Sequence, residues 1–130
     1  MKTMMTRANV RTEITKALKK GMLPSSEVIW NLGAQDSGPI GYVESRLHHG
    51  SRRSPVGLFV SHRRYSPKLE TLTVAQLVAR RPRLLPTISD LGPTQTQTSF
   101  WLALSSAHDA VQTCWDSAKF RGLVDAICED

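Results

Sequence analysis

The sequence predicts an α+β fold: a mostly helical single domain with a small two- or three-stranded antiparallel β element and a long C-terminal core helix. Apolar residues recur every three or four positions near both ends of the chain, which is typical of amphipathic helices. The middle of the chain contains short runs rich in β-branched and aromatic residues, which favour strands. The 130 residues, 40% of them hydrophobic, have the length and composition of one globular domain covering residues 1–130.

Residues 6–22 are predicted to form a basic helix that packs against the core. The positive residues lie largely off an apolar stripe that is formed by Val10, Ile14, Ala17, Leu18 and Gly21. A helix that lies on a membrane favours Trp or Phe in its apolar face, and this stripe contains neither. We therefore expect the stripe to face the protein core, with Gly21 and Pro24 ending the helix.

The Arg-rich middle, residues 25–70, is predicted to contain the β element. Residues 27–32 (EVIWNL) indicate a strand, and the string 33–39 that follows has the composition of a turn. Residues 55–62 (PVGLFVSH) form a short apolar run, which predicts a second strand that could pair with the first. Residues 39–50 favour a helix by the spacing of their apolar residues, but they alternate well enough for a strand, and both interpretations stay open.

The C-terminal half, residues 73–128, is predicted to be helical. Thr73 and Gln76 have the spacing of a capping box, in which each side chain bonds the backbone N–H of the other residue. This arrangement predicts a helix that starts at Thr73 and continues to about Arg81. Pro82 is expected to stop it, because proline lacks the N–H that the next helical turn needs.

The strongest helical pattern lies near the C-terminus. Pro86 is expected to open a helical turn before it, and Thr94 with Gln97 repeats the capping-box spacing. The core-facing stripe that follows consists of Phe100, Leu104, Ala107, Val111, Cys114 and Ala118. A second stripe follows in a different register, which predicts a kink or break between Lys119 and Gly122.

Nothing in the sequence indicates a membrane or exported protein. The apolar runs are far shorter than the roughly 20 residues of a spanning helix, and the apolar stretch of a secretory signal is missing. Cys114 and Cys128 lie 14 positions apart. On one continuous helix this is about 21 Å, too far for a disulfide. We expect two small buried thiols in a cytoplasmic protein with no membrane partner.

No combination of residues points to catalysis, a cofactor or a metal. The potential metal ligands show no spacing typical of a metal site; they are His48, His49, His62, His108, Cys114 and Cys128. Ser105, His108 and Asp109 share one helical turn, but adjacent His108 and Asp109 cannot easily face each other as a catalytic pair. With no nucleotide-binding loop and no nucleophile motif, we expect a protein that is not an enzyme.

Positive charge is concentrated in the middle of the chain. Residues 46–83 contain nine basic residues, eight of them arginine, and one acidic residue, whereas residues 84–130 carry a net charge of −4. Arginine binds phosphate and carboxylate groups in a bidentate manner, so we expect a polyanionic partner. Tyr65 could add stacking on a base. The predicted partner-binding residues are Arg46, Arg52, Arg53, Arg63, Arg64, Tyr65, Arg80, Arg81 and Arg83, helped by Arg7, Arg11, Lys19 and Lys20.

Two functional hypotheses follow from this charge distribution. The first is a small non-enzymatic binding protein whose Arg-rich band contacts nucleic acid or a nucleoprotein complex. The alternative is a protein-binding inhibitor or adaptor that docks on an acidic protein surface. Such a protein would block a host nucleoprotein machine, as a mobile-element or viral anti-defence protein such as a CRISPR inhibitor does. Only the first hypothesis predicts that free oligonucleotide competes for the binding surface.

Overall fold

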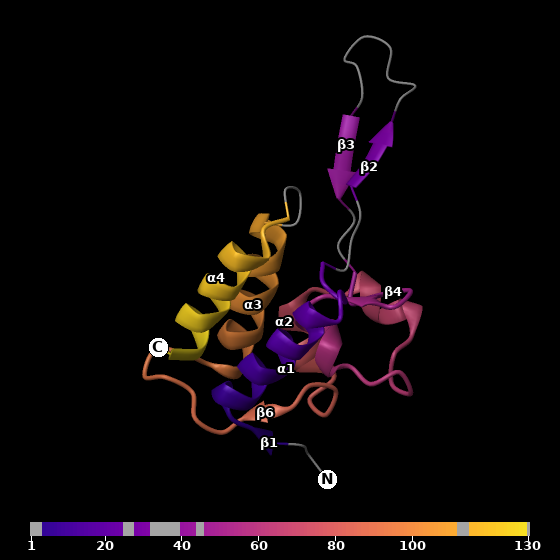
Figure 1. Cartoon of the computed structure of the whole chain (residues 1–130). Coiled ribbons are helices and arrows are strands. Elements are labelled where there is room, and N and C mark those ends of the chain that lie inside the picture. The colour runs from indigo at the N-terminus through magenta and orange to yellow at the C-terminus, as the bar shows by residue number, and fades with distance from the viewer. Residues whose placement is uncertain (1–3, 25–27, 32–39, 44–45, 112–114, 130) are drawn as a thin grey trace.

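Four α-helices account for most of the secondary structure in the part of the chain that the structure describes (Figure 1). The structure is a computed structural model, and it describes residues 4–24, 28–31, 40–43, 46–111 and 115–129. The helices are α1 (Arg7–Lys19), α2 (Val74–Arg80), α3 (Gln97–Val111) and α4 (Ser117–Glu129). Three two-stranded sheets accompany them in these residues, which confirms the predicted α+β, mostly helical fold class.

The helices pack around one cluster of buried side chains. α1 packs on α4, α4 on α3 and α3 on α2, so helices from the two ends of the chain lie side by side (Figure 1). α3 is the long C-terminal core helix that the sequence predicted, since its Phe100, Trp101 and Leu104 are at most 1% exposed. Burying side chains of this size contributes about 2–3 kcal/mol each, so α3 contributes substantially to core stability.

α1 forms as the sequence predicted and packs on the core. Its buried residues are Val10, Ile14 and Ala17. The N-terminus is closed by a capping box in which Thr6 Oγ1 accepts from the Asn9 N–H at 3.1 Å, and Asn9 Oδ1 accepts from the Thr6 N–H at 3.1 Å. The helix ends before Gly21, whose φ of +71° lies in the left-handed region that glycine enters without steric cost.

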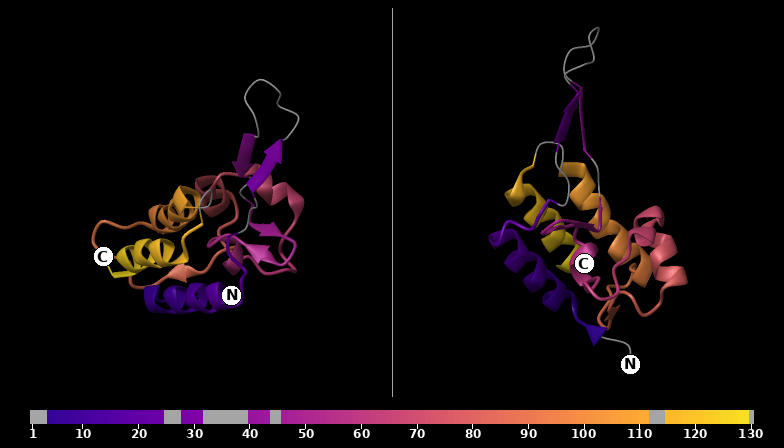
Figure 2. Two further views of the ribbon diagram at one scale, coloured as in Figure 1. Left: turned by 45° about the horizontal axis from the view of Figure 1, so that its top comes forward. Right: turned by 90° about the vertical axis from the view of Figure 1, so that its right-hand side faces the viewer.

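The first predicted strand is confirmed as β2 (Val28–Asn31), and it pairs in antiparallel orientation with β3 (Ile40–Val43). Val28 lies opposite Val43 in the register. Residues 40–43 are therefore a strand, which decides between the two interpretations of this segment. Both views of Figure 2 show the β2–β3 hairpin projecting away from the helices. The predicted turn at 33–39 lies outside the described residues.

The second predicted strand, residues 55–62, is wrong. A 3₁₀ turn, η1 (Gly57–Phe59), occupies this segment instead. The chain turns here because the Gly57 N–H donates to Ser54 Oγ at 3.0 Å and the backbone of Gly57 lies directly against Leu47. A β-carbon at position 57 would lie only 1.9 Å from the Leu47 carbonyl oxygen. The short hairpin of β4 (His48–His49) and β5 (Arg52–Arg53) lies just before this turn in the chain.

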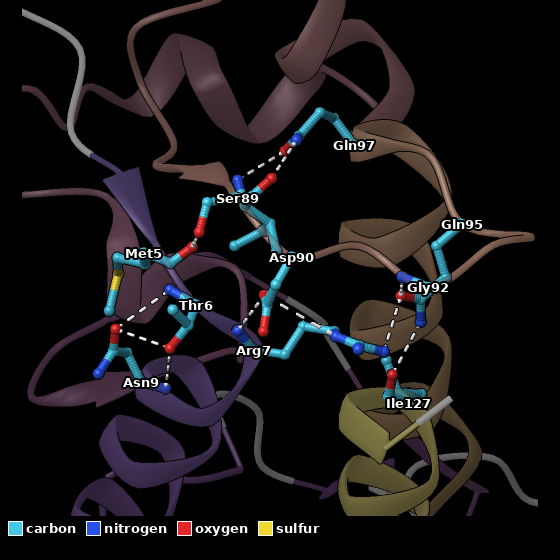
Figure 3. Close-up of polar contacts among 11 residues, drawn as sticks. Met5, Thr6, Arg7, Asn9, Ser89, Asp90, Gly92, Gln95, Gln97 and Ile127 are labelled. Carbon is cyan, nitrogen blue, oxygen red and sulfur yellow. Dashed lines mark hydrogen bonds and ion pairs between the residues drawn. The ribbon is translucent and has the colours of Figure 1, made fainter.

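The helical turn predicted after Pro86 is also wrong, because this segment forms β6 (Thr87–Ile88). β6 pairs in parallel with β1 (Met4–Met5), close to the start of the chain. The Ser89 N–H donates to the Met5 carbonyl at 2.9 Å, and the Ser89 hydroxyl donates to the same carbonyl at 3.4 Å (Figure 3). The outer edge of β6 is closed by Gln97, whose side chain accepts from the Ile88 N–H at 3.0 Å and donates to the Ile88 carbonyl at 2.8 Å.

Two boundaries near the C-terminus differ from the prediction. α3 is capped by Thr96 and Ser99, with the Ser99 N–H donating to Thr96 Oγ1 at 3.0 Å, rather than by Thr94 and Gln97. The break predicted between Lys119 and Gly122 is misplaced, because α3 ends at Val111 and α4 runs without interruption over Ser117–Glu129. Asp116 Oδ1 accepts from the Lys119 N–H at 3.0 Å and so caps the start of α4.

One of the two predicted buried thiols is confirmed. Cys128 on α4 is a free, buried cysteine, and burial raises the pKa of its thiol to about 11. The thiol is therefore protonated at neutral pH and packs as a small apolar group. Cys114 lies outside the described residues.

Candidate anion-binding groove

Four arginines line one surface groove of about 470 Å³, which we call the arginine groove. The lining residues come from two segments of the chain, 64–69 and 80–84; they are Arg64, Ser66, Leu69, Arg80, Arg81, Pro82, Arg83 and Leu84. All four arginines are exposed. The sequence predicted each of them as a partner-binding residue, and the fold brings these four to one place.

Pro82 explains how three arginines come to lie in an exposed loop at the end of α2. Arg80 is the last residue of α2, and Arg81 caps it with its N–H donating to the Leu77 carbonyl at 2.9 Å. The helix cannot continue, because a residue before proline is excluded from the helical region and proline donates no hydrogen bond. Leu77 and Leu85, on either side of the loop, are buried, so the loop is anchored while its arginines stay outside.

The opposite wall of the groove comes from the turn that carries Arg64 and from the 3₁₀ helix η2 (Pro67–Thr71). The Arg64 N–H donates to the Ser61 carbonyl at 3.0 Å, which closes the turn. Arg64 Nη1 donates to the backbone carbonyl of Arg83 across the groove. Arg64 therefore ties the two walls together with one of its five donors, which leaves other guanidinium N–H groups for a ligand.

Two smaller hollows, each of about 290 Å³, adjoin the arginine groove and share lining residues with it. The first, the Phe59 hollow, is lined by Phe59, Ser61, Arg64, Arg83, Leu84 and Pro86. The second, the Lys68 hollow, is lined by Lys68, Leu69, Thr71, Leu72, Arg80 and Arg81. We call the arginine groove and these two hollows together the trough. It has the four arginines in the middle, Lys68 at one end and the aromatic ring of Phe59 at the other.

No carboxylate is among the described residues that line the trough. Within the described chain, the four arginines of the groove also form no ion pair. Four cations around one groove repel one another, so the groove carries a positive potential that an anionic ligand would relieve. The geometry suits a ligand with several anionic groups, because guanidinium groups meet phosphate and carboxylate oxygens in pairs.

The only acid of residues 46–83, Glu70, is used inside the protein. Its carboxylate accepts from the backbone N–H groups of Leu47 at 2.8 Å and His48 at 3.3 Å, and from the Tyr65 hydroxyl at 2.6 Å. These bonds hold the start of β4 against η2. Because the carboxylate is engaged by these donors, it is not placed to neutralise the arginine groove.

Comparison with known proteins identifies no relative of this chain. No protein-family model, curated protein or solved structure matches the chain. The chemistry of the trough is therefore inferred from its own residues.

Tyr65, predicted to help by stacking on a base, is half-buried and packs on a neighbouring side chain. Its ring stacks on His48 with centroids 4.2 Å apart and planes 13° apart. Burial, reinforced by the hydrogen bond to Glu70, raises the pKa of Tyr65 to about 12, so the hydroxyl remains a donor at neutral pH. His48 Nε2 lies 3.0 Å and 2.9 Å from the carbonyls of Gly57 and Val60, and must carry the proton. Burial lowers the pKa of His48, which favours this neutral ring.

The two arginines of α1 lie elsewhere, on the side of the helix that faces α4 and the loop after β6. Arg7 donates through its backbone N–H to Asp90 at 2.8 Å and through Nη1 to Gln95 at 3.4 Å (Figure 3). Arg11 Nη1 lies 3.0 Å from a Glu129 carboxylate oxygen and 4.0 Å from one of Asp125. Arg11 thus links α1 to α4, Arg7 links α1 to the loop before α3, and neither arginine is among the residues that line the trough.

The other predicted residues are not among those that line the trough. Arg53 Nη1 donates to the Gly50 and Arg52 carbonyls, both at 2.7 Å, and so folds back on its own hairpin. The Arg53 N–H donates to the Met22 carbonyl at 2.7 Å, which brings the β4–β5 hairpin beside the end of α1, where Lys19 and Lys20 are exposed. Arg46 lines a separate hollow with Leu102, and Arg63 is exposed next to Arg64.

Sequence reasoning missed the apolar and lysine parts of the trough. Lys68 was counted in the charge of the central segment but was not assigned to the interface, and the apolar residues of the floor were not considered. The signal for Leu84 and Leu85 is available in the sequence, since an apolar pair directly after Arg-Arg-Pro-Arg indicates a loop anchored on the core. Phe59 was assigned to a strand, and that error hid its place beside Arg64 and Arg83.

Two further features, a metal site and a membrane-spanning helix, are not found among the described residues. These residues include no group of three or more His, Cys, Asp or Glu side chains that could hold a metal ion. Nor does the structure contain, in the ranges it describes, a helix with the length and hydropathy needed to cross a membrane. The expectation that adjacent His108 and Asp109 cannot easily face each other is wrong, because His108 Nδ1 lies 3.3 Å from Asp109 Oδ1. The His108 ring is nevertheless fully buried on α3 against Phe120 and Trp115.

Proposed function

We propose that this protein is a non-enzymatic binding protein whose arginine groove contacts the phosphates of a nucleic acid, either free or in a nucleoprotein complex. The observation that supports this function most directly is the convergence of Arg64, Arg80, Arg81 and Arg83 on one groove with no carboxylate in its described lining. Spaced phosphates match spaced guanidinium groups, and each contact releases condensed counterions. A cytoplasmic location, expected from the sequence, belongs to the same proposal.

The test is a salt titration of binding by fluorescence anisotropy, with labelled single-stranded and duplex oligonucleotides. Four phosphate contacts to a single strand predict a slope of log affinity against log salt of about −3. Affinity should therefore fall about 50-fold when salt is raised from about 50 to 200 mM. If no oligonucleotide binds at physiological salt, the proposal is wrong and the protein-binding alternative takes its place.

A matched pair of triple variants shows whether the groove is responsible. Replacing Arg80, Arg81 and Arg83 by glutamine should reduce the slope to about −1 and weaken binding at least about tenfold at physiological salt. The control replaces Lys16, Lys119 and Arg121, which are exposed and line no part of the trough, and so removes the same charge. Equal losses in both variants would show a diffuse charge effect and overturn the assignment to the groove.

The melting temperature separates loss of a ligand contact from loss of the fold. The groove arginines repel one another and form no ion pair within the described chain, so their replacement should leave the melting temperature unchanged or raise it slightly.

A competition experiment distinguishes nucleic acid from an acidic protein as the partner, with polyglutamate as the competing polyanion. Displacement of oligonucleotide by polyglutamate at equal charge concentration would favour an acidic protein partner over nucleic acid.

A further inference from the structure

We propose that the trough is built for a single strand of nucleic acid, with phosphates on the arginines and bases on an apolar floor. This inference deepens the proposed function and rests on it. A purely electrostatic site needs no apolar lining, yet the lining of the arginine groove includes the exposed Pro82, the half-buried Leu84 and the buried Leu69. Charge at the walls and apolar surface between them match a strand whose phosphates and bases are both exposed.

Leu84 lies where the phosphate-binding and base-binding parts of the trough meet. It lines both the arginine groove and the Phe59 hollow, and in each it is accompanied by Arg64 and Arg83. The side chain is half-buried, so part of its apolar surface remains accessible. A base that lies on this surface would keep its own phosphate within the region that the two guanidinium groups reach.

Phe59 provides an aromatic surface at the end of the trough. Its ring is half-buried and packs on Trp101 of α3, with centroids 5.1 Å apart and planes 58° apart. Because Trp101 is almost fully buried, the Phe59 ring is held from behind by the core. A ring fixed in this way loses little conformational freedom when a base stacks on it. Stacking on aromatic rings next to cations is how proteins bind single strands without regard to sequence.

A duplex fits this surface less well. Its bases are stacked inside, and its phosphates lie on a convex surface, so the apolar floor of a hollow would meet charged or hydrated groups. Duplex readers insert a helix or strand into a DNA groove, whereas these arginines lie around a hollow of about 470 Å³. That volume lies within the range of ligand-binding clefts.

The experiment compares three probes of about 12 nucleotides at one salt concentration: a base-bearing single strand, an abasic strand with the same phosphates, and a duplex. We expect the base-bearing strand to bind about tenfold more tightly than each of the other two. Equal binding of all three would leave the phosphate-binding function intact and overturn the single-strand inference. Binding of none would overturn the proposed function itself, so the two failures are distinguishable.

Two variants test the base-binding surface. Phe59→Leu and Leu84→Ser should each lower affinity for the base-bearing strand about five- to tenfold and leave affinity for the abasic strand unchanged. Leu102→Ser is the control, since Leu102 is an exposed leucine that lines a different hollow. If Phe59→Leu disturbs packing on Trp101, affinity for the abasic strand also falls. In that case the result with Leu84→Ser decides whether the trough binds bases. Loss of affinity for both strands in Leu84→Ser, or for neither, would count against base contact.

Discussion

At the residue scale, Glu70 determines how the positive charge of the central segment is used. It is the only acid among residues 46–83 and accepts from two backbone N–H groups and one tyrosine hydroxyl. A carboxylate engaged by three donors is held in place, and it stabilises the packing of η2 against the start of β4. The arginines around the groove consequently remain without an acidic neighbour, at a cost in electrostatic repulsion that a ligand can relieve.

The first prediction concerns Tyr65, which the sequence suggested as a base-stacking residue. Tyr65→Phe removes the hydroxyl that donates to Glu70 at 2.6 Å and keeps the ring stacked on His48. We expect the free energy of unfolding, measured by urea denaturation, to fall by about 1 kcal/mol, because a hydrogen bond to a charged acceptor is lost at a partly exposed site.

Oligonucleotide affinity in Tyr65→Phe should equal that of the wild type, since Tyr65 lines no part of the trough. If Tyr65→Phe instead weakened oligonucleotide binding and left stability unchanged, Tyr65 would be part of the binding interface.

At the scale of elements, the 3₁₀ turn η1 shows how one close backbone contact overrides a strand-like sequence. Residues 55–62 are apolar and β-branched enough to suggest a strand. Gly57, however, lies against the backbone of Leu47, where only a residue without a β-carbon fits. The turn also positions Phe59 beside Arg64 and Arg83 at the end of the trough.

Gly57→Ala is therefore expected to be strongly destabilising. The new β-carbon would meet three backbone atoms of Leu47 at 1.9 to 2.8 Å, so η1 and β4 must separate. We expect the free energy of unfolding to fall by about 3 kcal/mol or more, measured by urea denaturation.

Gly122→Ala on α4 is the matched control for Gly57→Ala. Nothing lies within 4 Å of a β-carbon at this exposed helical position. Alanine has the higher helix propensity, so this variant should gain up to about 1 kcal/mol. Equal effects of the two substitutions would contradict the close contact between Gly57 and Leu47.

At the scale of the whole molecule, the arginines fall into two groups, those that contact acidic residues and those that line the groove. The arginines of α1 meet the acidic C-terminal part of the chain, where Arg11 lies 3.0 Å from Glu129. The arginines of the central segment meet no acid at the groove. The ion pairs of Arg11 with the acidic C-terminal segment thus support the packing of α1 on α4, while the excess positive charge of residues 46–83 remains at the surface.

Arg11→Gln tests this division. The ion pairs of Arg11 are exposed to solvent, so the free energy of unfolding should fall by less than about 1 kcal/mol, and the difference should shrink at high salt. Oligonucleotide affinity should match that of Arg121→Gln, a control that removes one exposed charge elsewhere. An affinity loss as large as that of Arg81→Gln would place α1 within the interface, as the sequence suggested.

The helices could be predicted from the sequence because their signals are local. The capping box of Thr73 and Gln76 and the apolar stripe of α1 need only a few neighbouring residues, and both are present as predicted. The start of α3 was placed two residues too early, because Gln97 is used by β6, a strand from elsewhere in the chain. The break before α4 was misplaced because Asp116 caps that helix and Gly122 is tolerated inside it.

By itself, the sequence determined the fold class, the main helices and the inventory of arginines, since composition, periodicity and caps are properties of neighbouring residues. Only the tertiary structure decided which arginines act together. Arg64 lies 16 positions before Arg80, and it reaches the same groove because η1 turns, Glu70 holds the adjoining segment and Pro82 ends α2. Arg7 and Arg11 are separated from that groove because the packing of α1 on α4 directs them to other partners. Contacts between distant segments set these positions, and no local pattern encodes them.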